Sequence, residues 1–267
     1  MKEVTILIPT YERVNALTAT LTSLAMQSYQ NFDIVIADQS IDDGVKKDET
    51  LKAVYRFLQN HGCSISIFKN LPRVGLAQQR HFLLNKSHSR FSLFLDDDLL
   101  LEPFVLQNLV HTIKDEGCGF VGCAPIGLRY MNDYRPEQEH IELWDRNVMP
   151  EKIAVGGKKW NRYQLHNAAN LYHVEQKMHV TPMHPFKYKV AWIGACVLYN
   201  TEKLHKIGGF SFWKDLPIKH CGEDVAAQLR VMEKYGGCGL IPSGVYHQEL
   251  PTKIPDRSIN APEYMRY

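Results

Sequence analysis

The sequence predicts an α/β fold with a Rossmann-like, mainly parallel sheet flanked by helices, and two observations predict it. Short apolar runs alternate with amphipathic stretches through the first half of the chain, in the order strand, helix, strand, helix. The chain has 267 residues and is 45% hydrophobic, so it can bury a sizeable core. Such units join parallel strands by right-handed crossovers, and ligands then collect outside the carboxyl ends of the strands.

The first half contains apolar runs with the length of buried strands and stretches with the period of a helix. The predicted strands are 4–8, 32–37, 65–68 and 91–95, and the predicted helices between them are 14–26, 51–58 and 76–84. Polar residues follow each predicted strand, at 9–13, 38–43, 70–75 and 96–98. We therefore expect these polar residues to converge on one rim of the sheet.

The second half is less regular. A helix is expected at 103–114, a Gly-rich strand at 117–123 and another strand at 190–199. Helices are expected at 201–207 and 223–235, because a pair of glycines that can end a helix follows each of them. A last strand at 241–246 leads to His247, and the proline-containing tail 251–267 is expected to be an extended strap or a mobile terminus.

The segment from 127 to 189 has no clean period of 2 or 3.6 residues and is rich in histidine, tyrosine and tryptophan. We interpret 126–190 as an insertion that builds one wall of a pocket. The alternative is a structured loop whose aromatic rings cover the core.

Bulk composition limits the classes of partner. The formal net charge is +2, which gives no strong field for nucleic acid. The N-terminus runs directly into a strand pattern, and no apolar stretch approaches 18 residues, so we expect a soluble cytoplasmic protein and leave peripheral membrane contact open. The six cysteines show no zinc-like spacing and are expected to be reduced and not catalytic.

Three consecutive carboxylates, Asp96, Asp97 and Asp98, follow the predicted strand at 91–95. Adjacent acids repel one another unless a cation lies among them, and hard oxygen ligands suit Mg²⁺ or Mn²⁺ that carries a phosphorylated substrate. The alternative is that they cap the helix that begins near Pro103. One acid would serve as a cap, so three favour the metal.

Six segments in a fixed order carry a family resemblance. They are Ile-Leu-Ile-Pro-Thr-Tyr-Glu-Arg at 6–13, Asp38, Gly-Leu-Ala-Gln-Gln-Arg-His at 75–81, Phe-Leu-Asp-Asp-Asp at 94–98, Ile-Gly-Gly-Phe at 207–210, and Gly-Glu-Asp at 222–224 followed by Arg230. Together they resemble family 2 glycosyltransferases, the large inverting group built on the GT-A fold. Three positions depart from the family pattern, since Glu12, Gln79 and His81 replace its usual Asn, Ala and Asn.

The resemblance implies a nucleoside-diphosphate sugar as donor and Mn²⁺ or Mg²⁺ as cofactor. It implies that Asp98 is a direct metal ligand and that Asp96 holds the ribose or a metal-bound water. Asp97 would anchor the loop or touch the donor sugar. His247 matches a position where several GT-A enzymes place a third metal ligand, and a purely structural histidine is the alternative.

Asp224 is our choice of general base, because transfer requires a group that takes a proton from the acceptor hydroxyl. It lies at a helix start, so a close neighbour such as Glu223 or burial is needed to raise its pKa. The alternative is that the sequence 221–224 is a helix cap. In an inverting displacement, Asp224 should face the acidic turn across a cleft about one sugar wide.

The nucleoside pocket is expected to use residues that follow the first three strands. The predicted set is Pro9, Thr10 and Tyr11 against the base, Asp38 for its N–H, and Arg13 and Arg80 near the phosphates or the base. Only Asp38 favours UDP over GDP or dTDP. Capping by Thr10 and a solvated Arg80 are the plain alternatives.

The resemblance implies a single GT-A domain over 1–267, with a nucleotide-sugar half at 1–125, the insertion at 126–190, an acceptor half at 191–250 and the tail at 251–267. Trp144, Trp160 and Trp192 would present rings to an acceptor. The acceptor could be a saccharide, as in polysaccharide biosynthesis, a lipid-linked saccharide or a protein hydroxyl. The competing functions are a sugar-phosphate nucleotidyltransferase, a phosphotransferase with an aspartyl nucleophile, and a noncatalytic carbohydrate- or nucleotide-binding protein on the same fold.

Overall fold

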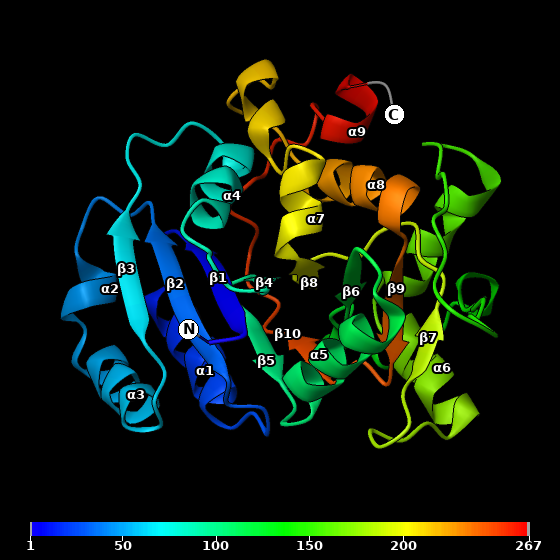
Figure 1. The fold of residues 1–267 in the computed structure, drawn as a ribbon, viewed down its shortest axis with the longest axis horizontal. Coiled ribbons are helices and arrows are strands. Elements are labelled where there is room, and N and C mark those ends of the chain that lie inside the picture. The colour runs from blue at the N-terminus through cyan, green and yellow to red at the C-terminus, as the bar shows by residue number, and fades with distance from the viewer. Residues whose placement is uncertain (1, 266–267) are drawn as a thin grey trace.

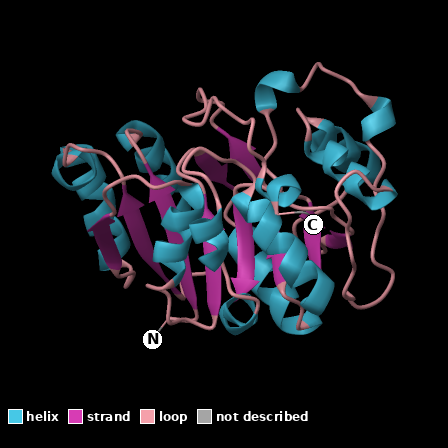
Figure 2. Cartoon of the chain, turned by 90° about the horizontal axis from the view of Figure 1, so that it is seen from above, coloured by secondary structure: helices cyan, strands magenta, loops and turns pink. Residues whose placement is uncertain are grey.

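The computed structural model describes residues 2–265, which form one eight-stranded sheet with helices on both faces (Figures 1 and 2). In spatial order the strands are β3 (Ile65–Lys69), β2 (Phe32–Asp38), β1 (Val4–Thr10), β4 (Phe91–Leu95), β8 (Cys196–Asn200), β6 (Phe120–Gly122), β9 (Gly237–Ile241) and β7 (Phe186–Tyr188). The neighbours β3, β2, β1 and β4 are parallel, whereas β8 runs antiparallel between β4 and β6. The predicted mixed, mainly parallel α/β sheet is therefore confirmed.

The helices pack in two layers. They are α1 (Val14–Ala25), α2 (Gly44–Lys47), α3 (Glu49–Asn60), α4 (Leu76–Leu84), α5 (Val105–Glu116), α6 (Asn170–Met178), α7 (Thr201–Lys206), α8 (Glu223–Tyr235) and α9 (Ala261–Tyr264). Short 3₁₀ helices occur at Leu128–Tyr130, Pro136–Gln138, Lys158–His166 and Ser211–Asp215. One core joins α1, α3 and α5 to the sheet, and a second core joins α4, α6, α7 and α8 to its other face.

The side chains of β1 show why both faces are covered. Ile6 and Ile8 are buried in the core with α1, while Leu7 is buried in the core with α4. Successive strand residues point to opposite faces, so a strand that is apolar at every position needs a layer on each side. Burying one such side chain fully contributes about 1.5–3 kcal/mol.

Two expectations about the second half were wrong, and one strand was missed. The apolar run at 190–199 becomes strand only from Cys196, directly after Ala195, whose φ is +66°. The strand expected at 241–246 is split, because Gly244 has a φ of +64° between the end of β9 and the start of β10 (Val245–His247). β10 pairs with β5 (Leu99–Leu101), a short strand that the sequence did not predict.

The segment 126–190 is only partly an insertion. Its 3₁₀ helices and α6 lie at one end of the molecule, but β7 pairs with β9 as the edge strand of the main sheet. All six cysteines are free, as expected. Among the described residues, no helix combines the length and the hydrophobicity that crossing a bilayer requires.

Candidate active site

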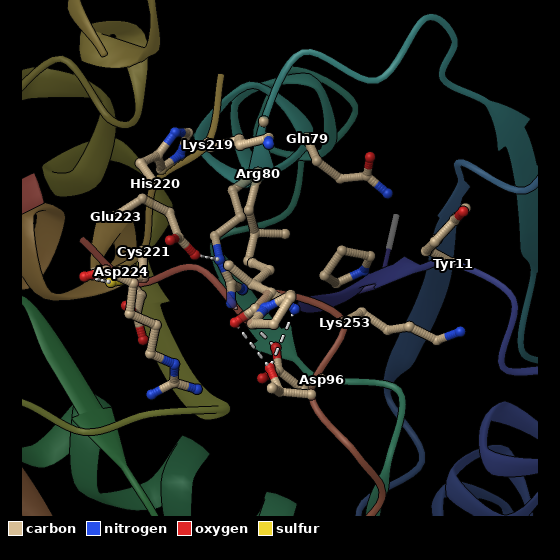
Figure 3. A pocket seen from close by; sticks show the side chains of 18 of the residues that line it. Tyr11, Gln79, Arg80, Asp96, Lys219, His220, Cys221, Glu223, Asp224 and Lys253 are labelled. Carbon is tan, nitrogen blue, oxygen red and sulfur yellow. Dashed lines mark hydrogen bonds and ion pairs between the residues drawn. The ribbon is translucent and has the colours of Figure 1, made fainter. Parts of the chain in front are cut away.

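A cavity of about 1080 Å³ opens at the carboxyl ends of β1 and β4 (Figure 3). It is bordered by the start of α4, the start of α8 and the C-terminal tail. Most of the predicted site residues line it, namely Pro9, Thr10, Tyr11, Arg13, Arg80, Asp96, Asp97, Asp98, Glu223, Asp224 and His247. The structure thus brings together segments that lie far apart in the sequence, and of the predicted residues it leaves out Asp38 and Trp144.

The three aspartates follow β4 and turn in different directions. Asp97 and Asp98 are only 5% and 4% exposed, whereas Asp96 is half-buried. Burial raises the pKa of Asp97 to about 6, although a hydrogen bond from the Thr10 hydroxyl at 2.6 Å opposes this shift. Burial also raises the pKa of Asp98. The turn therefore contains buried carboxylates that need a positive partner.

Arg13 provides that positive charge. Its Nη1 lies 2.6 Å from Oδ2 of Asp98 and 3.3 Å from Oδ1 of Asp97. Its Nη2 donates a hydrogen bond of 2.6 Å to the backbone carbonyl of Pro251. The guanidinium of Arg13 therefore joins the acidic turn to the C-terminal tail.

Arg80 connects the acidic turn to the start of α8 and is 4% exposed (Figure 3). Its Nε donates to Oε1 of Glu223 at 2.8 Å, and its Nη2 donates to Oδ1 of Asp96 at 3.1 Å. The gap between the Asp96 and Glu223 carboxylates is thus the width of one guanidinium. Asp96, Glu223 and Asp224 together raise the pKa of Arg80, against the effect of burial, so Arg80 stays charged.

The two adjacent acids of α8 have different surroundings. Glu223 is almost fully buried in its ion pair with Arg80. Asp224 lines the cavity, and its Oδ1 accepts the backbone N–H of Val225 at 2.9 Å. Burial and the charge of Glu223 raise the pKa of Asp224 to about 7, while Arg80 opposes the shift. Asp224 therefore changes protonation near neutral pH, as a general base requires.

The carboxylate oxygens of Asp96 and Asp98 are ligands of the kind that a divalent cation prefers. Among residues 2–265, no group of three or more His, Cys, Asp or Glu side chains is arranged to hold a metal. Mg²⁺ and Mn²⁺ are commonly held by one or two carboxylates together with substrate phosphates, and the two aspartates meet that requirement. A cation there would take the place of the Arg13 guanidinium, which now neutralises Asp98.

The hydrogen bond that the His247 ring accepts argues against a metal ion on its Nε2. Its Nδ1 accepts the backbone N–H of Glu249 at 2.7 Å, so a neutral ring carries its proton on Nε2. Nε2 lies 3.6 Å from Oδ2 of Asp98. A metal on Nε2 would require the other tautomer and would end the hydrogen bond with Glu249.

The expected nucleoside residues are placed unequally. Asp38 is fully buried, and its two oxygens accept from Lys69 Nζ at 2.6 Å and from the Ser40 backbone N–H at 2.8 Å. The hydroxyl of Thr10 is engaged by Asp97. Tyr11 lines the cavity, and the Arg73 guanidinium lies 3.6 Å from the centre of its ring.

The tail crosses the mouth of the cavity. Its residues from Thr252 to Arg257 line the cavity, and Lys253 pairs with Glu12 at 3.4 Å. Beyond them, the backbone of Cys221 accepts from Ala261 and donates to Ile259. The tail is therefore a strap that is fastened next to α8, and not a free terminus, as far as Met265.

Two of the three tryptophans proposed for the acceptor side line the cavity. These are Trp160 and Trp192, and Tyr163 stacks on Trp192 with a ring distance of 6.1 Å. Trp144 does not line the cavity and has Lys189 Nζ 5.2 Å from its ring.

Sequence reasoning missed several polar residues of the cavity, among them Gln39, Arg73, Gln79 and His220. His220 comes close because Gly75 has a φ of +104°, and a side chain on Gly75 would meet the His220 ring at 2.5 Å. Nε2 of His220 then accepts the backbone N–H of Ala77 at 3.1 Å. In the sequence, the only sign of Gln39 was its position directly after β2. For the other three residues, the sign was the turn at Gly75.

Comparisons with known proteins agree with this architecture. Residues 5–178, more than half of the chain, match the family described as Glycosyl transferase family 2. An uncharacterized glycosyltransferase of Haemophilus influenzae is 28% identical over 109 residues, which are 41% of this chain and 34% of that protein.

Solved structures share the fold. S. aureus TarS 1–349 superposes with a TM-score of 0.57 at 16% identity over 99% of this chain and 62% of that chain. Its complex with UDP-GlcNAc superposes with a TM-score of 0.58 at 16% identity, over 95% of this chain and 60% of that chain. The mannosyltransferase PcManGT from Pyrobaculum calidifontis, in complex with GDP-Man and Mn²⁺, superposes with a TM-score of 0.53 at 19% identity, over 89% of this chain and 56% of that chain.

The chain spans less than two thirds of the length of each of these relatives. The family match nevertheless covers β1, the acidic turn and α6, and the neighbours are GT-A glycosyltransferases. The chain belongs to glycosyltransferase family 2 and has the GT-A fold.

Proposed function

We propose that this chain transfers a sugar from a nucleoside-diphosphate sugar to a hydroxyl group of an acceptor, with inversion at the anomeric carbon and with a divalent cation. The observation that carries the proposal is the composition of the cavity. An acidic turn and a carboxylate with a pKa of about 7 line the same space. The acidic turn suits a leaving diphosphate with its cation, and the carboxylate suits removal of a proton from an alcohol.

The donor is a nucleoside-diphosphate sugar. A cavity of about 1080 Å³ suits a ligand of that size, since small-molecule sites commonly measure about 300–1,000 Å³. The related TarS structure was solved with UDP-GlcNAc and the related mannosyltransferase with GDP-Man and Mn²⁺. The diphosphate would lie beside the acidic turn, and the base would lie towards Tyr11.

Asp96 and Asp98 would hold the cation together with the donor phosphates, because their carboxylates are the hard ligands that Mg²⁺ and Mn²⁺ prefer. The cation would neutralise charge that builds up on the departing diphosphate. Arg13 leaves Asp98 when the donor enters and remains within reach of the phosphates. His247, whose Nε2 lies 3.6 Å from Oδ2 of Asp98, would stay beside that carboxylate.

Asp224 would take the proton from the acceptor hydroxyl as the new glycosidic bond forms. Glu223 and Arg80 position it, because Arg80 holds the start of α8 against the acidic turn. In an inverting reaction, the acceptor attacks from the side opposite the diphosphate. Trp160 and Trp192 would offer their rings to an acceptor saccharide.

A thermal-shift screen tests the proposal. The protein is heated with UDP, GDP, dTDP and their sugars, with and without Mn²⁺. A nucleotide present at 100 times its Kd should stabilise the fold by about 2.7 kcal/mol, and the shift should need the cation. No shift with any nucleotide would contradict a donor site, whereas a shift without turnover would favour a noncatalytic binding protein.

A further inference from the structure

Gln39 follows β2 and carries an unmatched hydrogen-bond donor. The residue is 6% exposed and lines the cavity. Its Nε2 is buried and has no hydrogen-bond partner among residues 2–265. A buried donor without a partner costs about 1–3 kcal/mol, so a native structure that keeps one generally needs it for a ligand or another function.

The backbone around Gln39 is fixed. Its N–H donates to the carbonyl of Thr10 at 3.0 Å, which extends the β1–β2 pairing beyond Asp38. Successive residues at a strand end point in opposite directions, and here Asp38 turns to Lys69 while Gln39 borders the cavity. The amide of Gln39 is therefore held at the cavity wall by the sheet.

A second buried glutamine in the same wall makes a useful contrast. Nε2 of Gln79 donates to the carbonyl of Ala37 at 2.7 Å, and its Oε1 accepts from Asn70 at 3.4 Å. Gln79 is thus satisfied within the protein and braces α4 against β2. Gln39 has the same side chain and similar burial, but its donor is unpaired.

We propose that Gln39, and not Asp38, recognises the donor's base, by donating a hydrogen bond from Nε2 to a carbonyl oxygen of the nucleobase. This inference rests on the proposed function. Asp38 is fully buried and does not line the cavity, and its oxygens accept hydrogen bonds from Lys69 and from the Ser40 backbone, so Asp38 is not placed to meet a base. Arg73 on the same wall adds further hydrogen-bond donors.

This chemistry selects bases that carry an oxo group beside the ring N–H. Uracil has two carbonyl oxygens and guanine has one, whereas adenine has none. A carboxamide can also accept the adjacent ring N–H through its Oε1. UDP and GDP share this feature, and they should both bind more tightly than ADP.

The test is isothermal titration of UDP, GDP, ADP and pyrophosphate into the wild type and into Gln39→Leu. Leucine removes the donor at nearly constant volume. We expect the affinity for the better of UDP and GDP to fall about ten-fold, as for a lost hydrogen bond in a desolvated site. The affinities for ADP and pyrophosphate should change less than two-fold, because neither offers a base carbonyl.

Gln79→Leu is the matched control for folding. It leaves the Ala37 carbonyl without a partner and should lower Tm, whereas Gln39→Leu removes only an unpaired group and should leave Tm unchanged or raise it. Gln39→Glu has nearly the same size and carries only acceptors, so it loses the hydrogen bond to a base carbonyl but can still accept the ring N–H. Its affinity should fall below that of the wild type, but less than in Gln39→Leu.

The outcomes separate the two proposals. If the wild type binds no nucleoside diphosphate, the proposed function fails. If UDP or GDP binds the wild type and both Gln39 variants equally, the donor site stands and the role of Gln39 is wrong. If base preference is lost in Asp38→Asn but kept in Gln39→Leu, the base is recognised by Asp38.

Discussion

At the scale of single residues, Glu223 and Asp224 show how one step along a helix separates two chemical roles. Glu223 points to Arg80 and is neutralised by it. Asp224 points to the cavity and is destabilised as an anion by burial and by Glu223. The two acids have nearly equal intrinsic pKa values, but their surroundings make Glu223 a positioning group and Asp224 a candidate base.

The pH dependence of transfer should report Asp224. Because the base must be ionised, and its pKa is raised to about 7, kcat/KM should rise with pH and level off above about pH 8. At pH 6 the rate should be about a tenth of the plateau. Steady-state rates at saturating Mn²⁺ from pH 5.5 to 9 measure this, and a flat profile would contradict the assignment.

Asp224→Asn should stabilise the fold at high pH. The folded pKa of about 7 lies above the unfolded value of about 3.9, so this group's contribution to stability is fully present below about pH 4 and is lost as the pH rises through 7. The variant should therefore melt above the wild type at pH 8, and the difference should shrink towards pH 4. Calorimetric Tm values at both pH values decide this, and an equal difference at each pH would refute it.

Glu12 occupies a strained backbone position. Its φ is +51°, in the left-handed region that asparagine tolerates better than glutamate. Glu12→Asn should raise the free energy of unfolding by about 0.5–1 kcal/mol, since the exposed pair with Lys253 contributes little. Denaturant titration measures it, and Glu12→Gln is the control because it keeps the strain. An equal gain in both variants would assign the effect to charge.

At the scale of elements, Arg80 joins α4, the turn after β4 and the start of α8. Because it is buried between Glu223 and Asp96, it holds three segments that are distant in sequence. The carboxylates that face each other across the active site are kept in place by this contact. The sequence marked Arg80 as a nucleotide contact, and its bonding partners are protein groups.

Arg80→Met should destabilise the protein by about 3–5 kcal/mol, because it leaves Glu223 buried and unpaired. Adding Glu223→Gln should restore part of the loss, with a coupling of about 1–3 kcal/mol. A double-mutant cycle from urea unfolding measures the coupling. Strictly additive effects would mean that the ion pair does not hold α8.

The elements also show what sequence can predict. The alternation of strand and helix is a local pattern, so the strands of the first half and helices such as α8 could be predicted. The short ribbon of β5 with β10 could not, because its partners are separated by well over a hundred residues and three-residue strands have little period. The break between β9 and β10 depends on the positive φ of Gly244, which a glycine in the sequence allows but does not require.

In the candidate site, too, the sequence could predict some features and not others. The motifs placed Asp96, Asp98 and Asp224 in one cavity. They did not reveal that Asp38 is neutralised by Lys69, although these residues are direct partners in the parallel register of β2 and β3. Nor did they reveal Arg13 on the acidic turn, because side-chain direction at a strand end depends on the assembled sheet.

At the scale of the whole molecule, the parallel strands β3, β2, β1 and β4 form one half of the sheet, and the half that contains β8, β6, β9 and β7 packs against α8 (Figure 1). The tail crosses the mouth of the cavity and is tied to Arg13 and to Cys221. The groups proposed to bind the donor therefore follow the parallel strands, whereas the candidate base lies on α8, over the other half of the sheet. This arrangement would place the donor on one side of the cavity and the base that activates the acceptor on the other.

The most direct test of this account compares the wild type with Asp224→Asn in two measurements, the Kd of the donor nucleotide with Mn²⁺ and the rate of sugar transfer. In the proposed mechanism Asp224 meets the acceptor and not the diphosphate, so the variant should bind the donor with an unchanged Kd and transfer sugar about 10²–10⁴-fold more slowly. Turnover equal to the wild type would contradict the account, and so would a loss of donor binding that matches the loss of rate.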